Sequence, residues 1–382
     1  MSNYNQSKLF KFSFVFAVIF LIINIRILTG MEFSNALEKF FFLITAGLLL
    51  FRTKNKDILL ILGIAIVVTL IAAIFSKNPE FSWGIYFKAI TQVLIIFLLC
   101  AGLLYETEQK FVLKFCAWLP PLMVLIAFFY AVVGLRPIFS IEYVSSLPRL
   151  QLTLIPAFLG GLSIATTYAA LKCSDRYNYR YLWLFAFNMV ILLLSAARGP
   201  LVISLLLSIY VFFSGFKGQK NLKILVVMLT VLGLSTIVVV AGDVIFGRLF
   251  QSHLSGREII WEHLSFVSSI YPNFGVGFGH QIYFMPRGVT TLTGGTIGAH
   301  NEFLRILVEI GRVPTYIFFL CIALLCYVVS INARTKSPVE VLIAGFLFFI
   351  YCAFDNVIAN PNLFLFFVVV FWSNSSIYLE SD

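Results

Sequence analysis

The sequence predicts an all-α polytopic membrane protein with about 12 transmembrane helices and one large loop that contains short helices. The chain has 382 residues, of which 60% are hydrophobic, and its mean hydropathy is +0.98. Only 12% of the residues are charged, against about a quarter in a typical soluble domain. Long apolar runs recur along nearly the whole chain, so these three observations exclude a soluble globular protein.

The candidate spans are apolar runs separated by short polar segments. They cover residues 12–29, 36–51, 57–75, 84–104, 112–134, 151–171, 181–196, 199–214, 222–243, 313–331, 338–353 and 361–378. Several are shorter than the roughly 20 residues that a helix needs to cross the hydrocarbon.

The first span has two interpretations. Two lysines precede its apolar stretch, as in a signal peptide, but no small-x-small cleavage site follows. Because more spans come after it, we predict a first transmembrane helix.

The spans at 181–196 and 199–214 are separated only by the segment SAARGP. The two could be one broken element. Residues 181–214 are too long for a single crossing, so we favour a helical hairpin.

Basic residues predict the orientation. With the N-terminus inside, the cytoplasmic segments hold 11 Lys and 4 Arg, whereas the remaining positions hold 9 Arg and 3 Lys. These arginines are Arg26, Arg136, Arg149, Arg198, Arg248, Arg257, Arg287, Arg305 and Arg312. Arginine suits bidentate binding of phosphate, although it also tolerates partial burial better than lysine does.

All four histidines, and five of those nine arginines, fall between residues 244 and 312. We therefore expect the chemistry on the outer face of the membrane. The predicted organisation is an N-terminal transmembrane bundle at 1–243, a periplasmic loop with catalytic elements at 244–312, and C-terminal transmembrane helices at 313–382.

Arg198 lies between two apolar runs and is followed by Gly199 and Pro200. This position is near the membrane surface or slightly within it, where a cation is costly unless it pairs or faces a water-filled cavity. Arg198 is therefore a functional candidate. The alternative is a turn arginine that snorkels to the membrane surface. Pro200 suits the first turn of a new helix.

A helix is predicted from about Gly256 to Ile270, since Ser255 and Glu258 have the spacing of a capping box. Arg257 lies in its first turn and could reach an anion near the helix start. The alternative is a solvated charge stacked on Trp261, which lies one turn further along the same face. We interpret the following glycines, at 275, 277 and 279, as a turn.

The segment GAHNEFLRILVEIG, residues 298–311, predicts a short amphipathic helix lying at the membrane interface. Its apolar stripe contains Phe303, Ile306, Leu307 and Ile310, and Glu302, Arg305 and Glu309 lie on the other side. His300, just ahead of this helix or in its first turn, can be neutral at pH 7 and accept a proton. A surface histidine is the alternative.

Asp355 and Asn356 fall between the last two spans, where Asp355 could be a structural partner or could steer an arginine or an acceptor sugar. The segment Asn360–Pro361 indicates an ordinary helix start. Four histidines with nearby carboxylates raise the question of a metal site. The chain has no H-x-x-x-H, H-E-x-x-H, D-x-D or C-x-x-C spacing, so no metal is expected.

Three segments, in this order, make the chain resemble the O-antigen ligase and O-antigen polymerase superfamily. They are SAARGP, the Arg-x-x-x-Trp helix with its glycine turn in SGREIIWEHLSFVSSIYPNFGVGFG, and the His-Asn and Glu-x-Gly of AHNEFLRILVEIG. The resemblance implies a GT-C-like fold and a metal-independent, inverting glycosyltransferase of lipopolysaccharide or related polysaccharide biosynthesis. It also implies a location in the bacterial inner membrane, with both termini cytoplasmic and the active site periplasmic.

By motif position, the resemblance implies that Arg198 and Arg257 bind the donor diphosphate and that His300 acts on the acceptor hydroxyl. The supporting candidates are Arg248, Arg305, Glu258, Glu302, Asn301 and Asp355. The implied partners are an undecaprenyl-diphosphate-linked oligosaccharide, an acceptor glycan or lipid A-core, and a chain-length regulator protein. No cofactor and no nucleic acid are expected.

Three functions are consistent with these features. We favour a polymerase of O-antigen or related repeat units. The first alternative is a ligase that joins the polymer to lipid A-core. The second is a transporter or flippase of lipid-linked oligosaccharide, for which the chain shows few mid-span charges and no clear inverted repeat.

Overall fold

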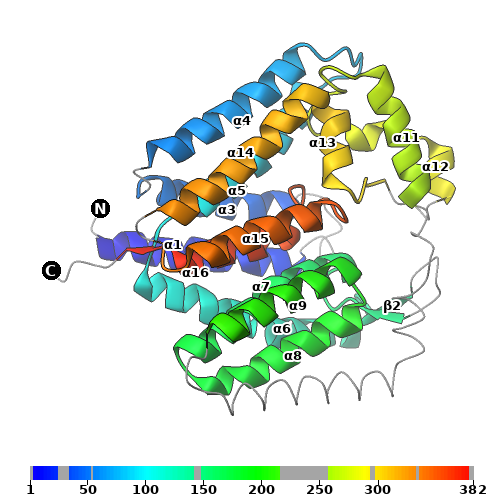
Figure 1. Ribbon diagram of the computed structural model, residues 1–382. Coiled ribbons are helices and arrows are strands. Elements are labelled where there is room, and N and C mark those ends of the chain that lie inside the picture. The colour runs from blue at the N-terminus through cyan, green and yellow to red at the C-terminus, as the bar shows by residue number, and fades with distance from the viewer. Residues whose placement is uncertain are drawn as a thin grey trace. The chain divides into compact units, whose positions relative to one another are not determined.

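The computed structural model describes residues 3–24, 34–52, 55–141, 148–215, 257–292, 297–332 and 335–377 (Figure 1). The described chain is almost entirely helical, with 14 α-helices, two 3₁₀ helices and four strands of two or three residues. The expected span at 222–243, together with Arg248 and His253, lies outside the described residues.

The chain divides into two compact units. The first comprises residues 1–40 and 105–252, and the second comprises residues 41–104 and 253–382. Helix α3 (Ser34–Leu50) and strand β1 (Leu104–Tyr105) contribute residues to both.

The first unit is organised around α7, whose small residues let neighbouring helices approach closely. Its elements are α1 (Asn3–Ile23), α6 (Glu106–Val132), β2 (Phe139–Ile141), β3 (Pro148–Leu150), α7 (Pro156–Arg176), η1 (Tyr179–Tyr181), α8 (Leu182–Ser195) and α9 (Arg198–Ser214). Helix α7 packs against α6, α8 and α9 (Figure 1). A Cβ at Gly160 would lie 2.4 Å from the Cβ of Ala197, which shows how tightly the α8–α9 turn sits on α7.

The segment 182–214 forms two separate helices, as the hairpin prediction expected. Helix α8 ends at Ser195 and is followed by Ala196, which has a left-handed backbone with φ 51°. Helix α9 begins at Arg198, two residues later. Pro200 therefore lies in its first turn.

The second unit contains α4 (Lys56–Ile74), α5 (Trp83–Ala101), α11 (Arg257–Ile270), η2 (Gln281–Phe284), α12 (Arg287–Leu292), α13 (Glu302–Ile310), α14 (Arg312–Ile331), α15 (Pro338–Cys352), α16 (Pro361–Asn374) and β4 (Ser376–Ile377). Helix α16 is buried over its whole length, as an all-round apolar sequence predicts. The Trp372 Nε1 donates to the Leu99 carbonyl at 2.6 Å and joins α16 to α5.

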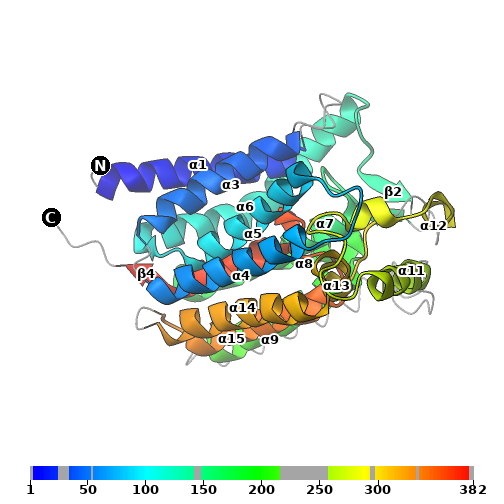
Figure 2. The same ribbon diagram turned by 90° about the horizontal axis from the view of Figure 1, so that it is seen from above.

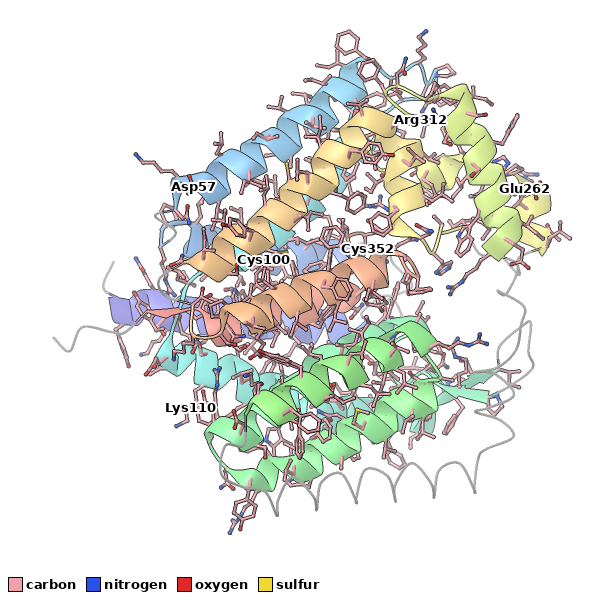
Figure 3. The ribbon with its side chains drawn as sticks, viewed as in Figure 1. Asp57, Cys100, Lys110, Glu262, Arg312 and Cys352 are labelled. Atoms are coloured by element: carbon pink, nitrogen blue, oxygen red, sulfur yellow. The ribbon has the colours of Figure 1, made fainter. Side chains whose placement is uncertain are left out.

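Helices α4 and α14 pack side by side and run antiparallel within this unit (Figure 2). Asp57, in the first turn of α4, and Arg312, the first residue of α14, lie at opposite ends of the pair (Figure 3). Helices α11, α12 and α13 gather at the end marked by Arg312. The short helices of this unit thus lie beyond one end of the α4–α14 pair.

Each expected span within the described residues coincides with a helix. Among the described residues, α1, α4, α5, α6 and α14 are long and apolar enough to cross a membrane, and four shorter helices are also apolar. The chain is therefore a multi-pass membrane protein. The sequence also located the end of α11 at Ile270 and the start of α16 at Pro361, which Asn360 directly precedes.

Candidate active site

His300 lies in the turn that leads into α13. Its φ angle is +47°, in the left-handed region. This backbone conformation costs a residue with a side chain about 1–2 kcal/mol of conformational free energy. The next residue caps the helix, because the Asn301 Oδ1 accepts a hydrogen bond from the N–H of Leu304 at 3.0 Å. The helix begins at Glu302, so His300 stands just ahead of it.

The His300 side chain pairs with Asp355, which lies 55 residues further along the chain in the loop between α15 and α16. The Nδ1 of His300 lies 3.2 Å from Oδ1 of Asp355, and their side chains are 24% and 11% exposed. Oδ1 of Asp355 also accepts from the N–H of Asn356 at 2.9 Å. A carboxylate beside Nδ1 favours the tautomer with the proton on Nδ1, which leaves the Nε2 lone pair free to take a proton.

Arg257, the first residue of α11, reaches the same loop. Its Nη1 donates to the carbonyl of Phe354 at 3.1 Å. Because Phe354 directly precedes Asp355, the Arg257 side chain and the His300–Asp355 pair lie in one neighbourhood of the second unit. A partly exposed guanidinium there can bind an anion beside the imidazole.

Helix α11 also contacts the residue that precedes His300. The indole Nε1 of Trp261 donates to the carbonyl of Ala299 at 2.7 Å. Trp261 packs against the small core of Ile260, Leu264, Val267, Val276, Ala299 and Val308. The sequence placed Trp261 on the same helix face as Arg257 but gave no sign of these two carbonyl partners.

The structure confirms a short helix within residues 298–311, α13, but protein covers its charged side. Glu302, Arg305 and Glu309 are 0%, 7% and 1% exposed, and the apolar residues Ile306 and Ile310 are fully buried. The charged side can be buried because the Arg305 guanidinium bridges Glu302 and Glu309, although Arg305 Nε and Glu302 Oε2 have no hydrogen-bond partner among the described residues.

Arg305 and Glu302, both predicted as supporting residues of the site, thus take part in a buried ion triad. Burial lowers the pKa of Arg305, but the two carboxylates outweigh burial and raise the pKa above its ordinary value. Burial also raises the pKa of the Glu302 carboxyl, and Arg305 opposes part of that rise. Removing one member of such a triad leaves an uncompensated buried charge.

The glycine turn fixes the far end of α13. Gly275 and Gly311 have φ of +66° and +82°, and a Cβ at Gly275 would lie 2.4 Å from the carbonyl carbon of Glu309. The N–H groups of Val276 and Gly277 donate to the carbonyls of Val308 and Glu309 at 2.9 and 2.8 Å. These glycines allow two protein segments to approach each other, rather than a ligand.

The other described histidines have structural partners. His280 is 1% exposed; its Nε2 accepts from the N–H of Ser82 at 2.9 Å, and its Nδ1 donates to the Phe278 carbonyl at 3.1 Å. His263 lies 2.6 Å from the Phe284 carbonyl through Nε2 and ties α11 to η2. Of the described histidines, His300 therefore has the features of a functional side chain.

Arg198 belongs to the first unit, at the start of α9, and its side chain is partly exposed. The guanidinium of Arg149 supports the preceding turn, because its Nε donates to the carbonyl of Ser195 at 2.9 Å. The sequence counted Arg149 among the outer arginines but did not predict this contact. Glu258 is exposed on α11, and Asn301 is occupied as the cap of α13.

Together, the helical architecture and the cluster of Arg257, His300 and Asp355 define a multi-pass membrane protein with a polar site built at the end of its long helices. Residues 182–320 match the model of the family described as O-antigen ligase. This part of the chain is therefore similar to the O-antigen ligase family domain, in agreement with the resemblance seen in the motifs. The match includes Arg198, Arg257 and His300 and ends before Asp355. A comparison with curated proteins found no match.

Proposed function

We propose that this protein is a metal-independent, inverting glycosyltransferase that uses an undecaprenyl-diphosphate-linked glycan as donor. The proposal is that it polymerises repeat units of O-antigen or a related surface polysaccharide. In support of the proposal, residues 182–320 match the family described as O-antigen ligase, and the motif resemblance implies enzymes of surface-polysaccharide synthesis that act on lipid-linked glycans.

The observation that carries the proposal is the His300–Asp355 pair beside Arg257. In the proposed reaction, Nε2 of His300 takes the proton from the acceptor hydroxyl as its oxygen attacks the anomeric carbon. Asp355 stabilises the imidazolium that forms. The bond between the anomeric carbon and the diphosphate oxygen breaks, and the lipid diphosphate leaves with its negative charge.

The arginines supply the complementary charge. Arg257 can hold the departing diphosphate next to the imidazole, because a guanidinium binds phosphate oxygens in a bidentate manner. Arg198 is proposed as a second ligand of the diphosphate on the strength of its motif. Arg149 then has a positioning role, since its contact with Ser195 supports the turn from which Arg198 extends.

The proposed location is the bacterial inner membrane, with both termini in the cytoplasm. Residues 244–312 and the loop between α15 and α16 then face the periplasm, where the lipid-linked donor and the acceptor glycan meet. The lysine-rich segments assigned to the cytoplasm support this orientation. A chain-length regulator protein is proposed as a partner.

A ligase that transfers the finished polymer to lipid A-core is the second candidate, because the description of the matching family names this activity. The ligase and the polymerase would use the same donor chemistry and would differ in the acceptor. The residues around His300 do not distinguish a sugar on a repeat unit from a sugar on the core.

A gel of cell-surface polysaccharide from a deletion strain separates the two candidates. Loss of a polymerase leaves core carrying a single repeat unit, whereas loss of a ligase leaves bare core and accumulated lipid-linked polymer. Complementation with Arg198→Ala, Arg257→Ala or His300→Ala should fail to restore long chains at normal protein levels. Normal ladders from all three variants would refute the proposal.

A further inference from the structure

Two side chains of α11 donate hydrogen bonds to the backbone next to His300 and Asp355. The Trp261 Nε1 donates to the carbonyl of Ala299, the residue before His300, at 2.7 Å. The Arg257 Nη1 donates to the carbonyl of Phe354, the residue before Asp355, at 3.1 Å. Positions 257 and 261 lie one helical turn apart on the same face, so one helix face spans both residues of the pair.

The contact with Ala299 bears directly on the backbone of His300. The Ala299 carbonyl belongs to the peptide plane that precedes the Cα of His300, and the rotation between them is the φ angle of +47°. A histidine leaves this left-handed region unless its surroundings hold it there. Ala299 is fully buried, so the indole N–H is a partner that water cannot easily replace.

Relaxation of His300 to a negative φ would rotate its Cα–Cβ bond and carry the imidazole away from Asp355. The 3.2 Å contact between Nδ1 and Oδ1 therefore depends on the orientation of the 299–300 peptide. Asp355 is held independently, through the bond from Asn356 and the bond from Arg257 to Phe354.

We propose that Trp261 is the positioning residue that aligns the His300 imidazole for proton transfer, acting through the Ala299 carbonyl without touching substrate. This inference rests on the proposed role of His300 as the general base. It assigns the indole N–H a function in turnover, in addition to the contribution of the ring to the core around Ile260 and Leu264.

The test compares two matched substitutions on α11. Trp261→Phe removes the N–H donor and keeps an aromatic ring. His263→Phe removes another ring nitrogen of the same helix, which contacts the Phe284 carbonyl at 2.6 Å and not the residue before His300 or Asp355. Both proteins are purified and reconstituted in lipid nanodiscs, and turnover is measured with the lipid-linked donor.

Trp261→Phe should lower kcat about 10-fold, the effect of losing one buried hydrogen bond of about 1.4 kcal/mol, and leave the KM for the donor within about twofold. His263→Phe should keep the wild-type kcat. A wild-type kcat in Trp261→Phe, or an equal loss in both variants, would overturn the positioning role.

A spectroscopic measurement separates positioning from a general loss of structure. The chain contains four histidines, so imidazole ¹⁵N spectra of selectively labelled protein can be assigned with single His→Gln variants. Trp261→Phe should shift the Nδ1 and Nε2 signals of His300 and leave those of His280 unchanged. An unchanged His300 spectrum would contradict the inference.

If Trp261→Phe does not fold, benzothienylalanine at position 261 replaces only the N–H with sulfur and keeps the shape of the indole. It should reproduce the loss of kcat, and normal turnover would count against the role of the N–H. The test distinguishes failure of the positioning role from failure of the proposed function. An active His300→Ala protein would show that His300 is not the general base. An inactive His300→Ala protein with normal Trp261→Phe turnover removes only the positioning role.

Discussion

Replacing Asp355 by asparagine isolates the charge that faces His300. Asparagine has nearly the same shape, and its Oδ1 can still accept from Nδ1 of His300 and from the N–H of Asn356. What is lost is the negative charge 3.2 Å from Nδ1. That charge matters most when the imidazole takes the proton of the acceptor hydroxyl and becomes positive.

The separation of the two atoms sets the size of the effect. At 3.2 Å, Coulomb's law gives about 1.3 kcal/mol in water and about 5 kcal/mol at an effective dielectric constant of ~20. The side chains are 24% and 11% exposed, which places the pair between these limits. An intermediate value of about 3 kcal/mol corresponds to a fall in kcat of roughly 100-fold, at 1.36 kcal/mol per factor of ten.

The assay measures the steady-state kcat for formation of the glycosidic bond by purified protein in nanodiscs at saturating lipid-linked donor. Glu262→Gln serves as the control, because Glu262 is an exposed carboxylate on α11 that has no part in the proposed machinery (Figure 3). A fall in kcat of less than about threefold for Asp355→Asn would refute the reasoning, since it would mean that no positive charge develops on His300.

Arg257→Lys should raise the KM for the lipid-linked donor at least about 10-fold, because an ammonium cannot bind two phosphate oxygens side by side; an unchanged KM would remove Arg257 from the donor site. Gly311→Ala should lower the thermal stability strongly, since its φ is +82° and a Cβ would lie 2.2 Å from the Asn273 carbonyl oxygen. Gly288→Ala, whose Cβ would have nothing within 4 Å, should leave the melting temperature nearly unchanged. Equal melting temperatures of the two variants would contradict the close approach of Gly311 to Asn273. Because burial raises the pKa of Glu302 in the folded protein, the folded state binds more protons than the unfolded state between the two pKa values. Stability should therefore fall as the pH rises above the usual carboxyl range, and Glu302→Gln should flatten this decline; equal pH dependence of unfolding would argue against a perturbed Glu302.

The sequence predicted most of the helical framework because apolar runs and helix-end signals are local. The end of α11 at Ile270 and the start of α16 at Pro361 follow from residues next to them in the chain. The break at Ala196 was also predictable, because residues 181–214 are too long for one crossing.

The burial of α13 was not predictable, because the charges of a helix with one charged side have two stable environments. They can face water, or they can be buried if they pair with one another, and the sequence pattern is the same. Glu302, Arg305 and Glu309 occupy the second environment. Their i+3 and i+4 spacing permits ion pairs in either case, so it does not reveal whether protein or water covers the charges.

The pairing of His300 with Asp355 could not be predicted from local sequence, because His300 precedes α13 and Asp355 follows α15 in the chain. The sequence identified each as a candidate and left Asp355 with two interpretations. Only the tertiary structure brings them together, along with the contacts of Arg257 and Trp261 to the carbonyls that precede them.

The most direct test of the account is to measure glycosidic bond formation and release of undecaprenyl diphosphate together, in wild-type protein and in His300→Gln. We expect one lipid diphosphate released for each bond formed by the wild type. His300→Gln should bind the donor normally and form bonds at least about 100-fold more slowly, at the lower end of the range for a general base. Bond formation at the wild-type rate by His300→Gln would contradict the assignment of His300 as the base that activates the acceptor.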